Sequence, residues 1–252
     1  MLRTVIAAAF LALLILLAGL PLLLASWLAG TIAPLYPAAV AGLRMTLALA
    51  GIRVRAAGTA NIPSGACLFF ANHTSAVDPV AVLLAVPRRI AFLAKQELFR
   101  IPLLGVAMRL AGFVPVDRAS REDAAKSADR AVEVLRCGIS MVIYPEGTRS
   151  PDGRLASFKR GGFLIAIRAA IPVVPVTILG AERVLPRSER WLRPGEIVVQ
   201  FHSPIDAAAC RPEDREALLE RVRAAIASAL PEQLRGAEEK PGKRMPADRS
   251  AG

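Results

Sequence analysis

Residues 66–86 read ACLFFANHTSAVDPVAVLLAV. The first six residues, Ala66–Ala71, form an apolar run that predicts a strand. A short polar segment follows, and the apolar residues from Pro79 to Val86 are typical of a helix. A strand that passes through a short turn into a helix is the repeating unit of an α/β fold.

The same alternation of short strands and longer helices continues from about residue 52 to residue 230. The expected strands are Ala66–Ala71, Ile90–Leu93, Phe113–Val116, Met141–Tyr144, Val173–Leu179 and Glu196–Phe201. The expected helices are Pro79–Val86, Leu98–Ala111, Arg121–Arg136, Gly161–Ala170 and Pro212–Leu230. This order predicts an α/β fold with a mostly parallel sheet flanked by helices.

The chain begins with a long apolar segment, because no charged residue occurs from Val5 to Gly30. At about 1.5 Å per residue, a helix of this length could cross a hydrocarbon core of about 30 Å. A secretory signal peptide is the alternative, but its apolar region spans only about 7–15 residues and ends at a small-residue cleavage site. The sequence shows no such site, which favours a retained membrane segment.

A second apolar stretch, Ala38–Gly51, is interrupted by Arg44 and suits an interfacial or re-entrant helix better than a full span. Basic residues flank the pair of segments, with Arg3 before them and Arg53 and Arg55 after them. Basic flanks tend to stay on the cytoplasmic side of a membrane. We therefore expect an N-terminal membrane-associated helical hairpin that dips into the cytoplasmic leaflet.

These features divide the chain into three parts. Residues 1–52 form the membrane-associated segment and residues 53–230 the α/β domain, while residues 231–252 are rich in proline, glycine and charge and read as a disordered tail. A length of 252 residues suits one large domain with an appendage. The 54% of hydrophobic and 21% of charged residues exclude an intrinsically disordered protein.

The chain carries 32 Lys and Arg against 21 Asp and Glu, a formal net charge of +11. This excess indicates an anionic partner, which is nucleic acid, an anionic membrane surface, or a phosphorylated or CoA-like molecule. Aromatic residues make up only 5% and do not alternate with basic ones, which argues against a nucleic-acid platform. Arginine outnumbers lysine, as in many bacterial proteins from GC-rich genomes, and the three cysteines are too widely spaced for a disulfide framework or a zinc site.

His73 follows the strand Ala66–Ala71, at the end of a strand where ligand sites of parallel α/β sheets collect. Asp78 lies five residues further on and could orient the imidazole as a general base, provided that the chain turns between them. In the alternative interpretation, Asp78 caps a helix that begins with Pro79, and His73 is a loop residue. The chain has no G-x-S-x-G motif, so a nucleophile would come from the substrate, as a hydroxyl group or water.

Three further segments lie where predicted strands end. They are Phe113–Arg118, Tyr144–Ser150 and Val173–Val176. Arg118 and Arg149 provide planar, permanently charged groups that suit a phosphate, although either could be a solvated surface charge. Gly147 allows a close approach of the backbone to a ligand.

Taken together, four segments in this order resemble the 1-acyl-sn-glycerol-3-phosphate acyltransferase family. They are Asn72–Asp78, Val116–Arg118, Tyr144–Ser150 and Val174–Val176. The resemblance covers about residues 66–180 and the apolar N-terminus. The chain departs from the family pattern at Tyr144, where phenylalanine is usual, at Pro115 within the second segment, and at Gln96, which replaces a lysine in a basic segment.

The resemblance implies an O-acyltransferase. His73 would be the general base on the acceptor hydroxyl, oriented by Asp78, and the acyl donor would be acyl-CoA or acyl-carrier protein. The residues expected to bind substrate are Asn72, Lys95, Asp117, Arg118, Glu146, Gly147, Thr148, Arg149 and Pro175. No metal or cofactor is expected, because a thioester is already activated.

The expected product is phosphatidate made from lysophosphatidate, at the cytoplasmic side of a bacterial inner membrane. A lyso-ornithine lipid or a lysophospholipid is an alternative acceptor for the same chemistry. Two other classes remain: a non-catalytic basic module that binds membranes, and a membrane-anchored hydrolase in which His73 activates water. Neither explains all four segments.

Overall fold

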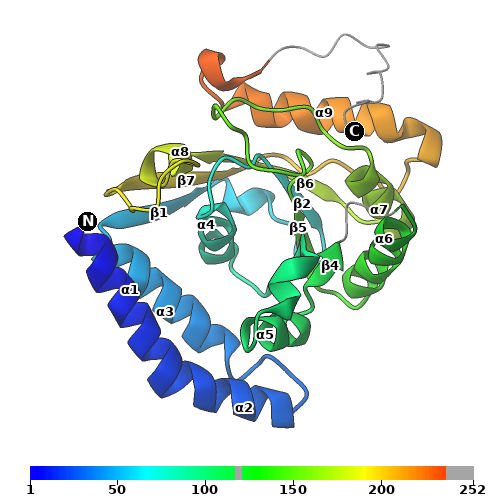
Figure 1. Cartoon of the computed structure of the whole chain (residues 1–252). Coiled ribbons are helices and arrows are strands. Elements are labelled where there is room, and N and C mark those ends of the chain that lie inside the picture. Colours follow the sequence, from blue (N-terminus) through cyan, green and yellow to red (C-terminus); the bar gives the residue numbers. More distant parts are fainter. Residues whose placement is uncertain (117–120, 237–252) are drawn as a thin grey trace, which may run out of the picture.

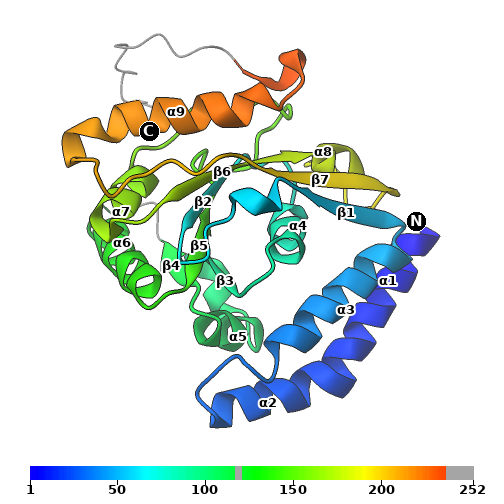
Figure 2. The ribbon, with the colours of Figure 1, turned by 180° about the vertical axis from the view of Figure 1, so that it is seen from behind.

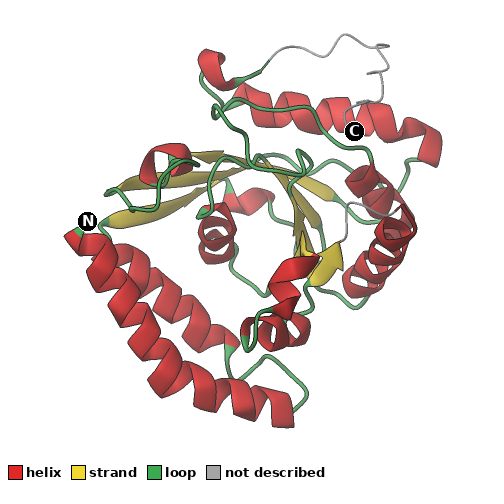
Figure 3. Ribbon diagram, in the orientation of Figure 1, coloured by secondary structure: helices red, strands yellow, loops and turns green. Residues whose placement is uncertain are grey.

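The computed structural model describes residues 1–116 and 121–236. Within them, seven strands form one sheet in the order β1-β7-β6-β2-β5-β3-β4. The strands are β1 (Ile52–Ala57), β2 (Leu68–Ala71), β3 (Ile90–Lys95), β4 (Val114–Val116), β5 (Ser140–Ile143), β6 (Val173–Leu179) and β7 (Gly195–Phe201). Figure 3 shows these strands surrounded by helices, so the predicted α/β class is confirmed.

Five neighbouring strands, β6, β2, β5, β3 and β4, run in the same direction. Strand β7 pairs antiparallel with β6, and β1 pairs parallel with β7. The prediction of a mostly parallel sheet is therefore correct. Strand β1 was not among the expected strands, because its arginines alternate along a sheet edge and only Ile52 is fully buried.

Helices cover both faces of the sheet. They are α4 (Asp78–Ala85), α5 (Leu104–Leu110), α6 (Arg121–Arg136), α7 (Gly161–Ala169), α8 (Ala181–Val184) and α9 (Arg215–Ser228). Figure 1 shows α4 inside the curve of the sheet and α6, α7 and α9 outside it. Along β2, Leu68 and Phe70 pack with the outer helices, whereas Phe69 and Ala71 pack with the inner ones. This double burial explains the unbroken apolar run of the strand.

Two expected helices are divided. Leu98–Ala111 was predicted as one helix, but it consists of a 3₁₀ helix at Gln96–Arg100 and of α5. Pro102 separates them, because proline disfavours a helical conformation in the preceding residue. The segment predicted as Pro212–Leu230 begins with a 3₁₀ turn at Pro212–Asp214 before α9.

The N-terminal helices form a hairpin beside the domain. Helix α1 (Leu2–Leu14), a π-helical segment (Ile15–Gly19) and α2 (Leu20–Leu28) run on from one another, and α3 (Tyr36–Leu49) returns along α1. Figures 1 and 2 show this hairpin projecting from the inner side of the sheet. The predicted helical hairpin is thus present.

The helix Leu2–Leu28 is long and apolar enough to cross a membrane, and only 6% of its most apolar window is buried. A helix in the core of a soluble protein would hide such a surface. Trp27, Leu28 and Leu17 are each more than 60% exposed. The exposure of this surface indicates association with a membrane.

Two side chains attach the hairpin to the α/β domain. The Tyr36 hydroxyl donates to the carbonyl of Arg88 and accepts from the N–H of Ile90. The Thr4 hydroxyl donates to the carbonyl of Leu192 at 3.3 Å and accepts from its N–H at 3.0 Å. The second contact joins α1 to the loop between α8 and β7.

Candidate active site

The polar segment after β2 is fixed at both ends. At its start, the Asn72 side chain donates to the carbonyl of Ile178 at 3.0 Å and accepts from its N–H at 2.7 Å. Asn72 is only 2% exposed, so its side chain is committed to the neighbouring strand β6. At its other end, the segment enters α4. The turn at residues 72–78 therefore has a defined shape before any ligand binds.

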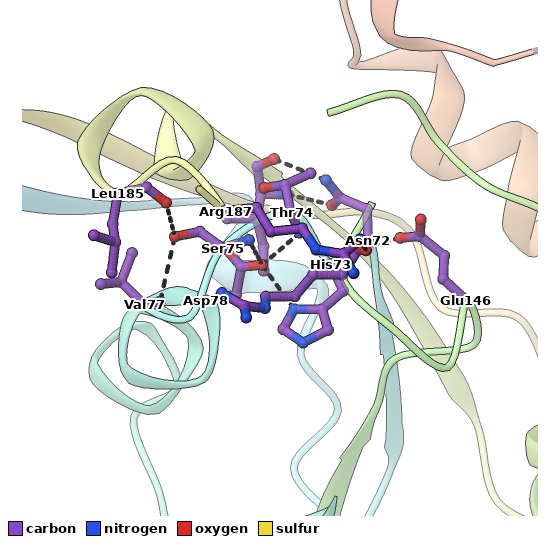
Figure 4. A network of polar contacts seen from close by, with 11 residues as sticks. Asn72, His73, Thr74, Ser75, Val77, Asp78, Glu146, Leu185 and Arg187 are labelled. Atoms are coloured by element: carbon purple, nitrogen blue, oxygen red, sulfur yellow. Dashed lines mark hydrogen bonds and ion pairs between the residues drawn. The ribbon is translucent and has the colours of Figure 1, made fainter. Parts of the chain in front are cut away.

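His73 and Asp78 meet across this turn. His73 Nδ1 lies 2.9 Å from Asp78 Oδ2, and the same oxygen accepts the N–H groups of Thr74 and Ser75 at 2.7 and 2.8 Å. Figure 4 shows these contacts converging on the carboxylate. Asp78 is fully buried and is the first residue of α4, whose N-cap is Val77. The interpretation of Asp78 as a helix cap is therefore wrong, since its carboxylate is turned back onto the turn.

The imidazole of His73 has one ring nitrogen left for chemistry. With Asp78 ionised, Nδ1–H donates to the carboxylate, so Nε2 carries the lone pair. Nε2 has no hydrogen-bond partner in the described part of the chain, and the His73 side chain is 18% exposed. The ring stacks on Tyr144 with centroids 4.2 Å apart. Tyr144, the residue that departs from the family pattern, thus forms one wall beside the base.

Glu146 comes from the loop after β5 and holds the backbone of His73. Its Oε1 accepts the N–H of His73 at 2.6 Å, and its Oε2 accepts the N–H of Ala156 at 3.0 Å. Glu146 is 4% exposed, and burial raises the pKa of its carboxyl to about 7, with a smaller rise from Asp78. The two N–H groups oppose this rise because they favour the charged form.

The rest of this loop is divided between buried and accessible residues. Gly147 is buried with φ of +78°, and a Cβ atom there would lie 2.9 Å from the Lys159 side chain. Thr148 is exposed and Arg149 is partly exposed, whereas Ser150 donates its N–H to the carbonyl of His73 at 2.8 Å. The loop is thus tied to His73 at both ends and presents Thr148 and Arg149 to solvent.

The other predicted site residues lie further away or outside the described residues. Lys95 stands at the end of β3, where its side chain is 66% exposed and pairs with Glu97 at 2.8 Å. Pro175 is buried in β6, directly beside Phe70 of β2. Asp117 and Arg118 fall within residues 117–120, outside the described ranges.

Sequence reasoning missed the loop between α8 and β7. Its Leu185 carbonyl accepts the hydroxyl of Ser75 at 2.7 Å, and its Arg187 guanidinium donates to the carbonyl of Arg149 at 2.6 Å. No motif marks this loop, and Arg187 lies 38 residues beyond Arg149 in the sequence. His202, the other histidine of the chain, follows β7 and contacts the Thr177 hydroxyl at 2.8 Å, away from the turn at residues 72–78.

The part of the chain that carries this site matches a known family. A family model described as Acyltransferase matches residues 53–179, half of the chain. The protein therefore belongs to the Acyltransferase family. The matched range contains both the turn at residues 72–78 and the loop at residues 144–150.

Named relatives point to one branch of this family. A chloroplastic 1-acyl-sn-glycerol-3-phosphate acyltransferase of Brassica napus, BAT2, is 38% identical over 59% of this chain and 44% of that protein. The 1-acyl-sn-glycerol-3-phosphate acyltransferase of Borreliella burgdorferi is 29% identical over 75% of this chain and 76% of that protein. The chain thus spans less than half of the plant relative.

A solved structure covers more of the chain. The crystal structure of the 1-acyl-sn-glycerophosphate (LPA) acyltransferase, PlsC, from Thermotoga maritima superposes with a TM-score of 0.69 at 27% identity. The match covers 88% of this chain and 96% of that one. The likeness therefore extends beyond the matched family segment.

Proposed function

We propose that this protein transfers a fatty acyl group to the free hydroxyl of lysophosphatidate and so makes phosphatidate. The observation that carries the proposal is the contact of 2.9 Å between His73 and Asp78, at the end of a central strand, in a member of the Acyltransferase family. The names of the relatives in plants and bacteria supply the substrate class.

In this mechanism His73 is the general base. Its Nε2 takes the proton of the acceptor hydroxyl as the oxygen attacks the thioester carbonyl. The tetrahedral intermediate then collapses, the C–S bond breaks, and the proton passes from Nε2 to the leaving thiolate. Asp78 holds the tautomer and stabilises the imidazolium that forms between these steps. The nucleophile is the substrate, so no acyl-enzyme is formed.

The predicted substrate-binding residues take two different roles in this proposal. Thr148 and Arg149 are accessible and bind the glycerol phosphate of the acceptor, together with Gly147 and Arg118. Asp117 is a further substrate-binding residue in this proposal. Three others support the site without touching the substrate. They are Asn72, which fixes the turn, Glu146, which holds the His73 backbone, and Pro175, which lies beside Phe70 of β2. Lys95 remains a weaker candidate for the same anion.

The acyl donor in this proposal is acyl-CoA or acyl-carrier protein, used as a substrate, with no metal or cofactor. The site faces the cytoplasmic side of a bacterial inner membrane, and the basic N-terminal residues rest on anionic lipid. Protease added outside sealed, right-side-out cells should leave residues 60–230 intact. Cleavage of this region from outside would contradict the proposed side of the membrane.

An acyl-transfer assay on the purified full chain tests the function. Lysophosphatidate is compared with lyso-ornithine lipid and a neutral lysophospholipid, each with palmitoyl-CoA and with palmitoyl-carrier protein, and products are identified by mass. We expect phosphatidate as the main product. Transfer to lyso-ornithine lipid alone would keep the chemistry and replace the acceptor, whereas release of free fatty acid without an acceptor would indicate a hydrolase.

A further inference from the structure

The loop between α8 and β7 touches both halves of the candidate active site. Its first residue, Leu185, accepts the hydroxyl of Ser75 from the catalytic turn. Arg187 then donates to the carbonyl of Arg149, the residue before Ser150, whose N–H binds the carbonyl of His73. One segment outside the four motif blocks is thus in contact with both motif segments, and Arg187 is linked to the His73 backbone through Arg149 and Ser150.

A cavity of about 500 Å³ opens at this junction. Thr74 and Ser150 line it from the two motif segments, and Arg187 and Ser188 line it from the loop. The Thr74 hydroxyl is buried and has no hydrogen-bond partner in the described ranges. Figure 4 shows Arg187 beside the turn that carries Thr74 and His73. The cavity is therefore lined by hydrogen-bonding groups from three segments, one of which is Thr74, the residue that follows the base.

Two acidic residues also border the cavity, but each has a basic neighbour. Asp152 accepts the Ser150 hydroxyl at 3.0 Å and pairs with Arg154, and Glu182 pairs with Arg183. Arg187, in contrast, has no ion-pair partner among the described residues. The Arg187 guanidinium has five N–H donors, and its one hydrogen bond among the described residues is to the Arg149 carbonyl. Arg187 is also exposed.

We infer that Arg187 binds a phosphate group of a substrate beside Arg149. Its remaining N–H donors form the planar fork that suits a phosphate, and its bond to the Arg149 carbonyl holds the second arginine next to it. The phosphate belongs to the acceptor or to CoA, and the position beside Arg149 favours the acceptor. The inference rests on the proposed function, because it assigns a substrate contact to the same site.

The test compares purified full-chain Arg187→Ala and Arg187→Lys with Arg190→Ala as the matched control. Arg190 is exposed in the same loop and makes no hydrogen bond or ion pair within the described residues. We expect Arg187→Ala to raise the KM for lysophosphatidate about tenfold, as for the loss of one charge-assisted contact, with partial recovery in Arg187→Lys. The Ki of glycerol 3-phosphate should rise in parallel, and Arg190→Ala should leave both constants unchanged.

Two donors distinguish the source of the phosphate. With S-palmitoyl-N-acetylcysteamine, which has no phosphate, an acceptor contact keeps the tenfold effect on lysophosphatidate. A contact with CoA instead raises the KM for palmitoyl-CoA and leaves the phosphate-free donor unaffected. Either pattern supports phosphate binding by Arg187.

A purely structural role would overturn the inference. In that case Arg187→Ala lowers kcat while both KM values and the Ki stay at their wild-type values, and Arg187→Lys recovers none of the lost activity. Calorimetric binding of glycerol 3-phosphate to wild type and Arg187→Ala provides a readout that needs no turnover. Failure of the wild type to make phosphatidate would sink the proposed function, whereas equal binding by both proteins would sink the role of Arg187.

Discussion

The turn at residues 72–78 and the loop at residues 144–150 each bring one buried carboxylate to His73, but to different parts of it. Asp78 contacts the imidazole ring and two backbone N–H groups through a single oxygen. Glu146 contacts no ring and uses one oxygen each for the N–H groups of His73 and Ala156. The first carboxylate is placed to act on the proton of the ring, and the second on the position of the backbone.

The contacts therefore predict two different roles: Asp78 takes part in the chemical step, and Glu146 supports the position of His73. A change at the ring or at Asp78 should lower the rate of the chemical step. A change at Glu146 should act through the placement of His73 and through stability. Variants at the three positions therefore test whether the two carboxylates have the separate roles that their contacts indicate.

The largest effect is expected for His73→Ala. Loss of a general base lowers kcat by about 10²–10⁴-fold, while the protein still folds and binds vesicles. Steady-state kinetics and vesicle flotation check the two parts. His202→Ala is the matched control, because His202 contacts Thr177 at a strand end rather than the turn. Turnover like that of the wild type in His73→Ala would remove His73 from the reaction.

Asp78→Asn should come next, with a fall in kcat of about 10²-fold and a small change in KM. Asparagine keeps the size of the side chain but cannot stabilise the imidazolium by charge. Single-turnover acyl transfer separates this loss from any change in substrate binding. If kcat is retained while the protein unfolds more easily, Asp78 only supports the turn, and the two carboxylates do not have separate roles.

Much of this site follows from local sequence. The strand before the turn and β6 were predicted to within two residues, because both are continuous apolar runs between polar segments. The pairing of His73 with Asp78 was expected from the resemblance to the acyltransferase family, whereas their spacing alone left a helix cap at Asp78 as the alternative. The structure adds the two N–H groups that hold the carboxylate in place.

The rest depends on contacts between distant parts of the chain. Glu146 was predicted to bind the acceptor, and its actual partner is the backbone of a residue 73 positions earlier. Arg187 reaches Arg149 across 38 positions from a loop without a motif. Both contacts involve backbone groups, which every residue carries, so no pattern of residue types could predict either of them. The edge strand β1 was missed because half-exposed strands carry polar residues that mimic a linker.

The smallest change in rate, and the sharpest dependence on pH, is expected for Glu146→Gln. Glutamine has one carbonyl oxygen and can accept only one of the two N–H groups of His73 and Ala156. The His73 backbone is then held less firmly, and we expect a fall in kcat of about tenfold or less. Rates and unfolding free energies measured at several pH values then test the predicted dependence on pH.

The unfolding measurement follows from the raised pKa of Glu146. In the folded protein its pKa is about 7, mainly because of burial, compared with an ordinary value of 4.5. Between these values the folded state holds a proton that the unfolded state has released, so the free energy of unfolding falls as pH rises from about 4.5 to 7. The fall amounts to roughly 3 kcal/mol and is complete above pH 7.

Glutamine cannot ionise, so the free energy of unfolding of Glu146→Gln does not show this fall with pH. The stability advantage of the wild type over the variant should therefore be largest at or below about pH 4.5, and it should shrink, or reverse, by pH 8. Denaturant unfolding in detergent measures the difference at each pH. Asp152→Asn is the control, because Asp152 is exposed and should give a difference that is flat over this range. A flat difference for Glu146→Gln as well would mean that Glu146 is already ionised at pH 5, and that its two backbone contacts outweigh its burial.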